Sequence, residues 1–467
     1  MRMRNWFLPL VGAALAVIGS QTVRGQEPPV YYPHMGAPQV TPASNANLAS
    51  ILERLEALEQ ATNTAADDAA AGSCKEVDVL TKPTQRWTGR VHLDSWQFPE
   101  ETGIANTLDG GDPAAGPDDF IGFRRLRFGV AGQVNETMVY KIEMEWAVPE
   151  DPAFKDAYLG WTELPFLHTV LMGNQKRPYG LDHLNSSRYN VFLERPFVIE
   201  AFNQDARRVG IQSYGVSENL AWNWRWGMSL MDDLQSTGNQ RTDNYQPEIH
   251  GRLANTIWYD EVSGGRGYAH WAVSGSLAMP GGGPDGRFQT RPEARTRNRW
   301  FDTGDLNANT YELVGLEGVI NLGALQIVGE YMATRVQRIG DTDVSFGGGY
   351  VYAAYFLTGE HMPWDRESGT LDRVRPFENF FLVPGCDGHL HKGWGAWQVA
   401  ARYSHGDFND DNVFGGIGNS MTLGLNWWWN PYARMQFNYI YGEIDDRGAP
   451  GGDGTYNIFG TRFMCDF

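Results

Sequence analysis

The chain has 467 residues, with 38 Lys and Arg against 56 Asp and Glu, a formal net charge of −18 at pH 7, and 13% aromatic residues. Because binding to nucleic acid needs a basic face that neutralises phosphates, this charge argues against a nucleic-acid partner. After the first twenty residues no stretch approaches the roughly 20 uncharged apolar residues of a membrane helix, so any membrane-spanning part beyond them has to consist of β-strands.

The N-terminus has the three parts of an export signal. Arg2 and Arg4 precede an apolar run from Trp6 to Ile18, and small and polar residues follow. We predict a signal peptide over residues 1–25 that is cleaved before Gln26, and a mature protein that leaves the cytoplasm. The alternative is a single membrane anchor, for which this apolar run is short.

Three segments precede the main part of the chain. Residues 26–44 are rich in proline and predict an extended segment. Residues 45–64 carry an a/d stripe that predicts a short coiled-coil helix, which needs either identical partner helices or a surface of its own domain to pack on. Residues 65–83 are small and polar and indicate a linker. The stripe consists of Leu48, Ile51, Leu55, Leu58 and Thr62.

From about Trp87 onward the pattern alternates with a period of two. The stretches MVYKIEMEW, LAWNWRWGMSL, AWQVAARYSH, SMTLGLNWWWN and YARMQFNYIYGEI each place large apolar side chains on one face and polar ones on the other. They are joined either by short turns, as in WWWNPYARM, or by long loops such as 232–247 and 280–309. Short turns at one end and long loops at the other are typical of an outer-membrane barrel.

A soluble β-sandwich alternates in the same way and is the competing interpretation. Two features favour the barrel: Trp and Tyr lie near strand ends, where a membrane interface would be, and polar side chains occur well inside strands, which suits a water-filled interior. At about 24 residues per strand, turns and loops included, there is room for roughly 16 strands. We therefore predict an all-β fold, in which residues 84–467 form a transmembrane antiparallel β-barrel of about 16 strands with an aqueous channel, preceded by the short coiled-coil helix.

The last residues, NIFGTRFMCDF, predict the closing strand of such a barrel. The period of two places Arg462 and Asp466 inside and Gly460 with them. This strand must pair with the first strand, near Trp87 to Phe98, because an open edge cannot be left in a membrane. The predicted lipid face consists of Phe459, Thr461, Phe463, Cys465 and Phe467.

Other motifs point to no chemistry. Three cysteines are too few for a disulfide scaffold or a metal site, and Cys74 and Cys386 are the pair that could oxidise after export. HGDFNDDN starts like a calcium loop but lacks its later glycine and glutamate, so it indicates an acidic extracellular loop. The sequence contains no HExxH, GxSxG or Walker motif, and we predict a protein that is not an enzyme and holds no metal or cofactor.

Cationic residues on the polar strand faces are candidates for an anion path. Arginine suits this role because its guanidinium is weakly hydrated and always charged. The alternative is that these arginines pair with carboxylates such as Glu143, Glu145 and Glu330 and stiffen a weakly selective channel. The candidates from the strand pattern are Arg125, Arg127, Lys141, Arg225, Arg402, Arg434 and Arg462.

Several stretches in order resemble the phosphate-selective porin O and P family, from about residue 120 to 467. They include FRRLRFGVAGQV, YKIEMEW, DAYLGWTELPFLHTVLMGNQKRPYGLDHLNSSRYNVFLERPF, RRVGI, YVYAAYFLTGEHMPWD, GAWQVAARYSHGDF and LGLNWWWNPYARMQFNY. The resemblance implies a 16-stranded porin of the bacterial outer membrane, usually a homotrimer, whose long third loop folds into the lumen. It also implies that basic and hydroxyl groups at this constriction hold the anion.

Carried onto this chain, the resemblance places the constriction loop after MGNQKRPYGLDHLNSSRYNVFLER, and it makes residues of this quoted stretch the candidates. Each of the two serines in it could donate to an anion or merely cap a turn after Asn185. The candidates are Lys176, Arg177, Ser186, Ser187, Arg188 and Arg195.

Two functions follow as hypotheses. The first is a porin for passive diffusion of small solutes, with a preference for anions such as phosphate; its partners would be these anions, membrane lipid and two identical subunits. The second is an envelope-anchoring protein, whose N-terminal segment tethers the barrel to the cell wall.

Overall fold

The computed structural model describes residues 82–99, 103–110, 117–148, 152–203, 207–234, 242, 245–283, 286–385, 388–449 and 451–467. The predicted signal peptide, Pro-rich segment and coiled-coil helix, most of the linker, and both Cys74 and Cys386 lie outside these residues, and the predictions about them stay predictions. Among the residues described, no helix combines the length and the apolar content needed to cross a membrane.

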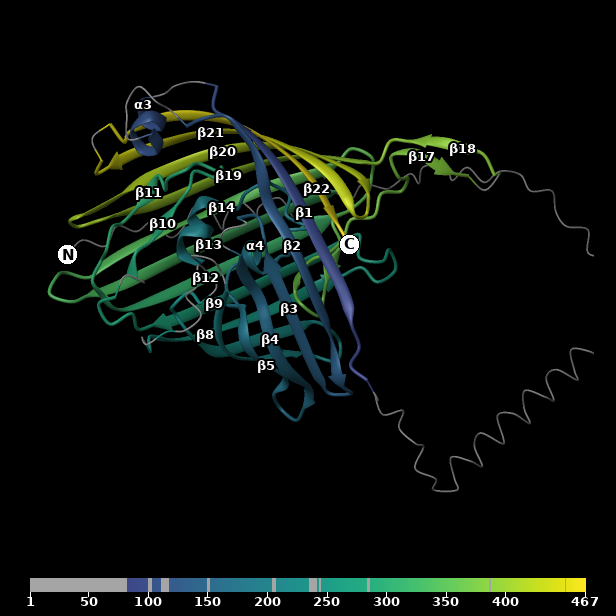
Figure 1. Cartoon of the computed structure of the whole chain (residues 1–467), viewed down its shortest axis with the longest axis horizontal. Coiled ribbons are helices and arrows are strands. Elements are labelled where there is room, and N and C mark those ends of the chain that lie inside the picture. The colour runs from purple at the N-terminus through teal and green to yellow at the C-terminus, as the bar shows by residue number, and fades with distance from the viewer. Residues whose placement is uncertain are drawn as a thin grey trace, which may run out of the picture. The chain divides into compact units, whose positions relative to one another are not determined.

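Sixteen antiparallel strands close into one barrel in the described part of the chain (Figure 1). Strands that follow one another in the barrel are hydrogen-bonded neighbours, as expected for a chain that turns back after each crossing. The predicted fold class is therefore confirmed. The strands are β1 Arg86–Gln97, β2 Phe120–Asn135, β3 Met138–Glu145, β4 Ala153–Leu164, β5 His168–Lys176, β6 Arg207–Val216, β7 Trp222–Leu230, β8 Pro247–Tyr259, β9 Gly267–Ala278, β12 Ala308–Leu322, β13 Leu325–Arg338, β14 Val344–Phe356, β19 Ala396–Asp410, β20 Val413–Asn430, β21 Ala433–Arg447 and β22 Gly454–Asp466.

The barrel closes where the last strand meets the first. β22 pairs with β1 in a continuous register from Arg90 opposite Asp466 to Gln97 opposite Phe459. Phe459 is exposed on the outside and Arg462 is buried inside, as the period of two predicted. The predicted closing strand and its pairing with the first strand are confirmed. No strand edge at this seam is left without a partner, as a membrane requires.

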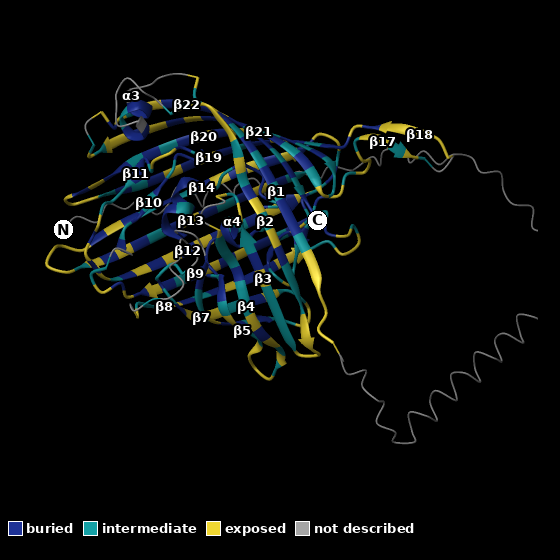
Figure 2. Cartoon of the chain, viewed as in Figure 1, coloured by how far each residue is buried: buried dark blue, intermediate teal, exposed yellow. Residues whose placement is uncertain are grey.

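Buried and exposed residues alternate along the strands, which Figure 2 shows as alternating dark and light bands. In β7, Trp226 and Met228 are each 53% exposed on the outside, whereas Asn223 and Ser229 are buried inside. Apolar side chains outside and polar ones inside are what a barrel in lipid around a polar interior needs. The sequence pattern thus predicted the faces of these strands correctly.

The connections differ in length between the two ends of the barrel, with exceptions at both ends: at the loop end only Asp411 and Asn412 join β19 to β20. Most turns at the end near the C-terminus are short, as between β12 and β13 or β20 and β21. However, the connection between β14 and β19, residues 357–395, is long. It lies at this same end, because successive strands run in opposite directions and every second connection therefore lies at the same end. The pattern of short turns predicted from the sequence therefore fails at this connection.

The connections between the barrel strands contain short helices and hairpins. The turn-end segment 357–395 contains two small hairpins, whereas the remaining elements belong to loops at the opposite end. The hairpins are β15 Trp364–Asp365 with β16 Thr370–Leu371, and β17 Phe381–Pro384 with β18 Leu390–Gly393. The loops carry α3 Gly103–Ala105, the π-helix η1 Asn106–Gly110, α4 Leu181–Leu184, α5 Phe197–Asn203, and β10 Gln289–Thr290 with β11 Phe301–Asp302.

Candidate functional site

The connection between β5 and β6 is described over residues 177–203, folds into the barrel and is the constriction loop expected from the sequence. Its helix α4 begins at Leu181, where the backbone N–H groups of Leu181 and Asp182 donate to Glu330 Oε2 and Oε1 at 2.6 and 2.8 Å. A carboxylate suits this place because the first N–H groups of a helix have no partner within it. Glu330 of β13 thus fastens the loop. The sequence had suggested Glu330 as the partner of a wall arginine, but among the described residues it forms no such pair.

The second helix of the constriction loop, α5, is anchored by apolar packing. Phe197 and Phe202 are almost fully buried, and the ring of Phe197 stacks on that of Phe301 with centroids 4.7 Å apart. Phe301 belongs to the loop between β9 and β12, so two loops that are distant in sequence share one apolar core inside the barrel. This core fills the side of the interior next to β13, β14 and β19.

The middle of the constriction loop is bound to the strands around the seam. Arg462 of β22 donates to Leu193 O, to Glu194 Oε1 at 2.8 Å and to both oxygens of Asp94 in β1 at 2.6 Å. Arg434 of β21 donates to Asn190 O at 2.7 Å. Because a loop inside a barrel cannot leave its carbonyl groups unpaired, side chains of the wall replace the missing backbone partners.

The part of the turn-end segment around β15 and β16 also enters the barrel and meets the constriction loop, whereas the hairpin of β17 and β18 projects away from the barrel (Figure 1). Arg225 and Arg252 of the wall donate to Ser368 O at 2.7 Å and Gly369 O at 3.1 Å. Within the barrel the backbone N–H of Leu371 donates to Asn185 Oδ1 of the constriction loop at 3.0 Å. Segments from opposite ends of the barrel are therefore in direct contact inside it.

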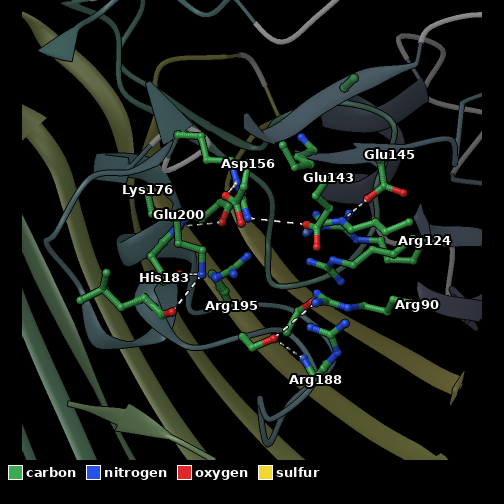
Figure 3. Close-up of a pocket in the computed structure, with 18 of the residues that line it drawn as sticks. Arg90, Arg124, Glu143, Glu145, Asp156, Lys176, His183, Arg188, Arg195 and Glu200 are labelled. Atoms are coloured by element: carbon green, nitrogen blue, oxygen red, sulfur yellow. Dashed lines mark hydrogen bonds and ion pairs between the residues drawn. The ribbon is translucent and has the colours of Figure 1, made fainter. Parts of the chain in front are cut away.

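A cavity of about 880 Å³ remains along the wall formed by β1 to β6 (Figure 3). Fourteen Lys and Arg side chains line it against seven Asp and Glu, so its lining is basic in a chain that is strongly acidic. The cations are Arg90, Arg124, Arg125, Arg127, Lys141, Lys155, Lys176, Arg188, Arg195, Arg207, Arg208, Arg291, Arg295 and Arg299. The carboxylates are Glu143, Glu145, Asp156, Glu200, Asp233, Asp365 and Asp372.

The strand carboxylates of the cavity are each held by a cation. Arg127 lies 3.1 Å from Glu143 and 2.6 Å from Glu145, and Asp156 binds both Lys141 and Arg207. In Figure 3 the three carboxylates Glu143, Glu145 and Asp156 lie along the upper side of the view. Paired in this way, the carboxylates leave little negative charge to repel an anion.

Other cations of the cavity are held by neutral groups. Arg90 donates to the hydroxyls of Ser186 and Ser187, and Arg125 lies 3.4 Å from the ring of His92. Lys176 donates to three backbone carbonyl groups of the constriction loop, among them Leu184 O at 2.9 Å. Neutral partners orient these side chains without cancelling their charge, so the charge is available to a passing anion.

His183 in α4 lies between charged groups at the cavity. Its Nε2 is 3.2 Å from Glu200 Oε2. Burial, helped by the positive charge of Arg195, lowers the pKa of His183 to about 4, although Glu200 acts in the opposite direction. The imidazole is therefore neutral at pH 7 and adds no charge to the cavity.

The structure brings together eight of the thirteen candidates from the sequence. The other five lie away from the cavity: Arg177 pairs with Glu248 at 3.0 Å, Arg402 with Glu293 at 2.6 Å and Arg462 with Asp94 at 2.6 Å, and Arg225 and Arg434 hold backbone carbonyl groups of the inserted segments. Their place is to fasten the segments that narrow the barrel. The eight at the cavity are Arg125, Arg127, Lys141, Lys176, Ser186, Ser187, Arg188 and Arg195.

Eight further cations of the cavity were missed, and two signals could have found half of them. Arg90 belongs to RVHLD, where Arg, His and Asp alternate with apolar residues as on the other strands. The run RPEARTRNR in the loop between β9 and β12 supplies three arginines with spacings of four, but nothing in its sequence shows that this loop folds inward. The missed cations are Arg90, Arg124, Lys155, Arg207, Arg208, Arg291, Arg295 and Arg299.

A family model described as phosphate-selective porin O and P matches residues 105–467. The chain belongs to this family. The porin is 28% identical over 399 residues to an uncharacterized protein of Caulobacter vibrioides, with 81% of this porin and 73% of that protein covered. It is 29% identical over 164 residues to Porin O of Pseudomonas aeruginosa, which covers 33% of this porin and 34% of Porin O.

Among solved structures, the porin is similar to a loop L8 deletion mutant of OmpT, an outer membrane protein of Vibrio cholerae. The TM-score is 0.51 at 14% identity, and 82% of this porin and 99% of the OmpT chain are covered. This similarity concerns the barrel fold alone. Together with the family, the closed barrel of sixteen strands makes the chain a porin of the bacterial outer membrane that forms a water-filled channel.

Proposed function

We propose that this porin prefers anions and conducts small inorganic anions, phosphate among them, through the basic cavity along β1 to β6. The observation that carries the proposal is the excess of cations over carboxylates in a cavity whose strand carboxylates are already paired. Fixed positive charge at a narrow point raises the local concentration of anions and lowers that of cations, whatever the net charge of the outer surface.

Phosphate is the anion that the family description and the name Porin O suggest, and the chemistry of the cavity supports it. Arg90 with Ser186 and Ser187 offers guanidinium and hydroxyl groups side by side. Phosphate oxygens accept hydrogen bonds from both kinds of donor, and guanidinium matches the geometry of two phosphate oxygens.

Planar-bilayer recordings test this proposal. In a KCl gradient the reversal potential of the purified porin should have the sign of an anion-preferring channel, and added phosphate should reduce the chloride current as it occupies the cavity. Arg125→Glu should shift the reversal potential toward cations, whereas Arg335→Glu, an exposed arginine paired with Asp343 outside the cavity, should leave it unchanged. A cation-preferring wild type would contradict the proposal.

We also propose that the porin functions as a homotrimer. β3 has 8 residues and β5 and β7 have 9, at or just below the lower end of the roughly 9–11 residues that a membrane-spanning strand needs. The outer face of the barrel around these short strands is apolar, with Ile142, Met172 and Ile211 each more than 40% exposed. Packing against neighbouring subunits would cover these side chains. Chemical cross-linking of the porin in detergent should give a trimer band, and a monomer alone would contradict this part.

Export by a cleaved signal peptide and the absence of enzymatic activity belong to the same proposal. An export signal fits the outer-membrane location of the barrel, and the sequence contains none of the hydrolase or nucleotide-binding motifs considered above. Among the described residues no group of three or more His, Cys, Asp or Glu is arranged to hold a metal ion.

A further inference from the structure

Asp466 is the penultimate residue of the chain and its carboxylate is buried inside the barrel. Asp466 is 3% exposed and lies opposite Arg90 in the backbone register of β22 with β1. Its backbone N–H donates to Tyr432 O at 2.9 Å, in the turn between β20 and β21. The carboxylate thus lies at the turn end of the last strand, where its place is set by the barrel wall on both sides.

Two arginines from two inserted segments converge on this one carboxylate. Arg188 of the constriction loop places its Nε 2.7 Å from Asp466 Oδ2. Arg373 of the turn-end segment donates from Nη1 to Oδ1 at 3.1 Å and from Nη2 to Oδ2. The carboxylate is buried, whereas the Arg188 and Arg373 side chains are 17% and 19% exposed, so one fixed negative group orients two cations at the edge of the cavity.

The neighbours of Arg373 extend this junction. Its guanidinium lies over the ring of Tyr432 at 4.4 Å and over that of Tyr189 at 5.6 Å, and it also donates to Pro431 O. Tyr189 and its neighbour Arg188 belong to the constriction loop and line the cavity. Asp372, the neighbour of Arg373 in the turn-end segment, lines the same cavity. Any movement of either arginine therefore moves residues that line the cavity.

We propose that Asp466 is a positioning residue for the channel, which clamps the constriction loop and the turn-end segment to the closing strand and so determines the width of the cavity. Glu330, Arg462 and Arg434 already hold other parts of the constriction loop, and Asp466 adds an anchor on the closing strand that the stretches around Arg188 and Arg373 share. Because Asp466 belongs to the strand that closes the barrel, the clamp forms only when β22 has paired with β1. The proposal concerns the width of the channel and does not depend on which ion it prefers.

The experiment is single-channel recording of the full-length porin with Asp466→Asn. The variant keeps the shape of the side chain but removes its charge, so both segments should loosen: we expect a higher conductance, greater noise in the open-channel current, and additional conductance levels. Asp445→Asn on the neighbouring strand, an exposed carboxylate, is the matched control and should behave as wild type. Asp466→Glu should restore the quiet current, because it restores the charge.

Partner substitutions separate a clamp from a general loss of structure. Arg188→Gln and Arg373→Gln should each increase the noise, and combining either with Asp466→Asn should add little, as expected for residues that act through one contact. These two variants leave the last strand intact, so they decide the matter even if Asp466→Asn fails to form a heat-modifiable barrel. Wild-type conductance and noise in folded Asp466→Asn, or in both arginine variants, would overturn the proposal.

Discussion

At the scale of single residues, Arg127 decides how much negative charge the cavity shows. It pairs with both Glu143 and Glu145, so its removal frees two carboxylates, whereas the removal of Glu143 frees part of the charge of Arg127. The two substitutions should therefore have opposite effects on ion selectivity even though they belong to one cluster.

We predict that Arg127→Gln lowers and Glu143→Gln raises the ratio of anion to cation permeability. A unit charge about 8 Å from the path of an ion contributes about 0.5 kcal/mol in water, and anion and cation feel it with opposite sign, so each ratio should change roughly two- to five-fold. Reversal potentials in a KCl gradient measure this ratio. Shifts in the same direction for both variants would contradict the pairing seen here.

The pH dependence of the channel should reveal the burial of His183. With a pKa of about 4, this histidine is neutral between pH 5 and 8, and it gains a charge in the cavity only in stronger acid. We predict that His183→Gln has the reversal potential of the wild type from pH 5 to 8, and that the wild type becomes more anion-preferring than the variant only below about pH 4. A difference that develops near pH 6.5 would indicate an exposed histidine.

The same shift affects stability in a defined direction. In the unfolded chain the histidine takes up a proton near its ordinary pKa of 6.5, whereas in the folded porin burial holds this pKa at about 4. The unfolded state therefore binds more protons in this window, and stability falls as the pH falls through it. Between pH 7 and 4.5 the wild type should lose more resistance to heat than His183→Gln, as measured by the temperature at which the folded band disappears on a gel.

Arg124 shows what strict alternation cannot predict. The register of β1 with β2 shifts between His92, opposite Arg125, and Leu93, opposite Phe123, so Arg124 is the extra residue of a β-bulge. A bulge re-aims the side chains beside it, and both Arg124 and Arg125 consequently line the cavity. A period of two, applied along FRRLRF, places Arg124 on the lipid face.

At the scale of elements, the barrel interior is organised by segments that the strand pattern does not describe. The constriction loop, the loop between β9 and β12 and the turn-end segment fill much of it, and strand side chains such as Arg462 and Glu330 hold their backbone groups. The sequence predicted that polar side chains would face inward. It did not predict that many of them bind protein and not water, because that depends on which loop folds back.

We predict that Asp94→Asn weakens the attachment of the constriction loop at the seam. Arg462 would lose the charge of Asp94, to which it donates twice at 2.6 Å, and would keep Leu193 O and Glu194. Breaking a buried ion pair costs about 3–5 kcal/mol, and the remaining partner Glu194 places the expected loss at the lower end of this range. The folded porin should then convert to the unfolded form at a lower temperature on a heat-modifiability gel. Asp343→Asn breaks an exposed pair with Arg335, which is worth about 0–1 kcal/mol, and should leave the temperature unchanged.

At the scale of the whole molecule, the distribution of charge separates the interior from the surface. A formal net charge of −18 coexists with a basic cavity, because exposed carboxylates such as Asp341 and Asp411 lie in the loops. A net charge therefore says little about a pore, whose selectivity depends on the few groups that line it.

The role of the N-terminal segment is the remaining hypothesis at this scale. We predict that deletion of residues 27–73 leaves the single-channel conductance unchanged, because the barrel closes between β1 and β22 without them. If these residues assemble subunits, the deletion should abolish the trimer in cross-linking, and if they tether the barrel, it should release the porin from cell-wall fractions. An altered conductance would contradict the view that the channel is complete in the barrel.

The sequence by itself determined the barrel, the faces of its strands and the pairing of the last strand with the first, because a period of two and a closed edge are local requirements of strands in lipid. It also located the constriction loop, through the resemblance of its residues to a family. Only the tertiary structure decided which arginines line the cavity and which fasten loops, as with Arg125 and Arg402. The reason is that partner choice inside a barrel depends on contacts between segments far apart in the chain, which no local pattern encodes.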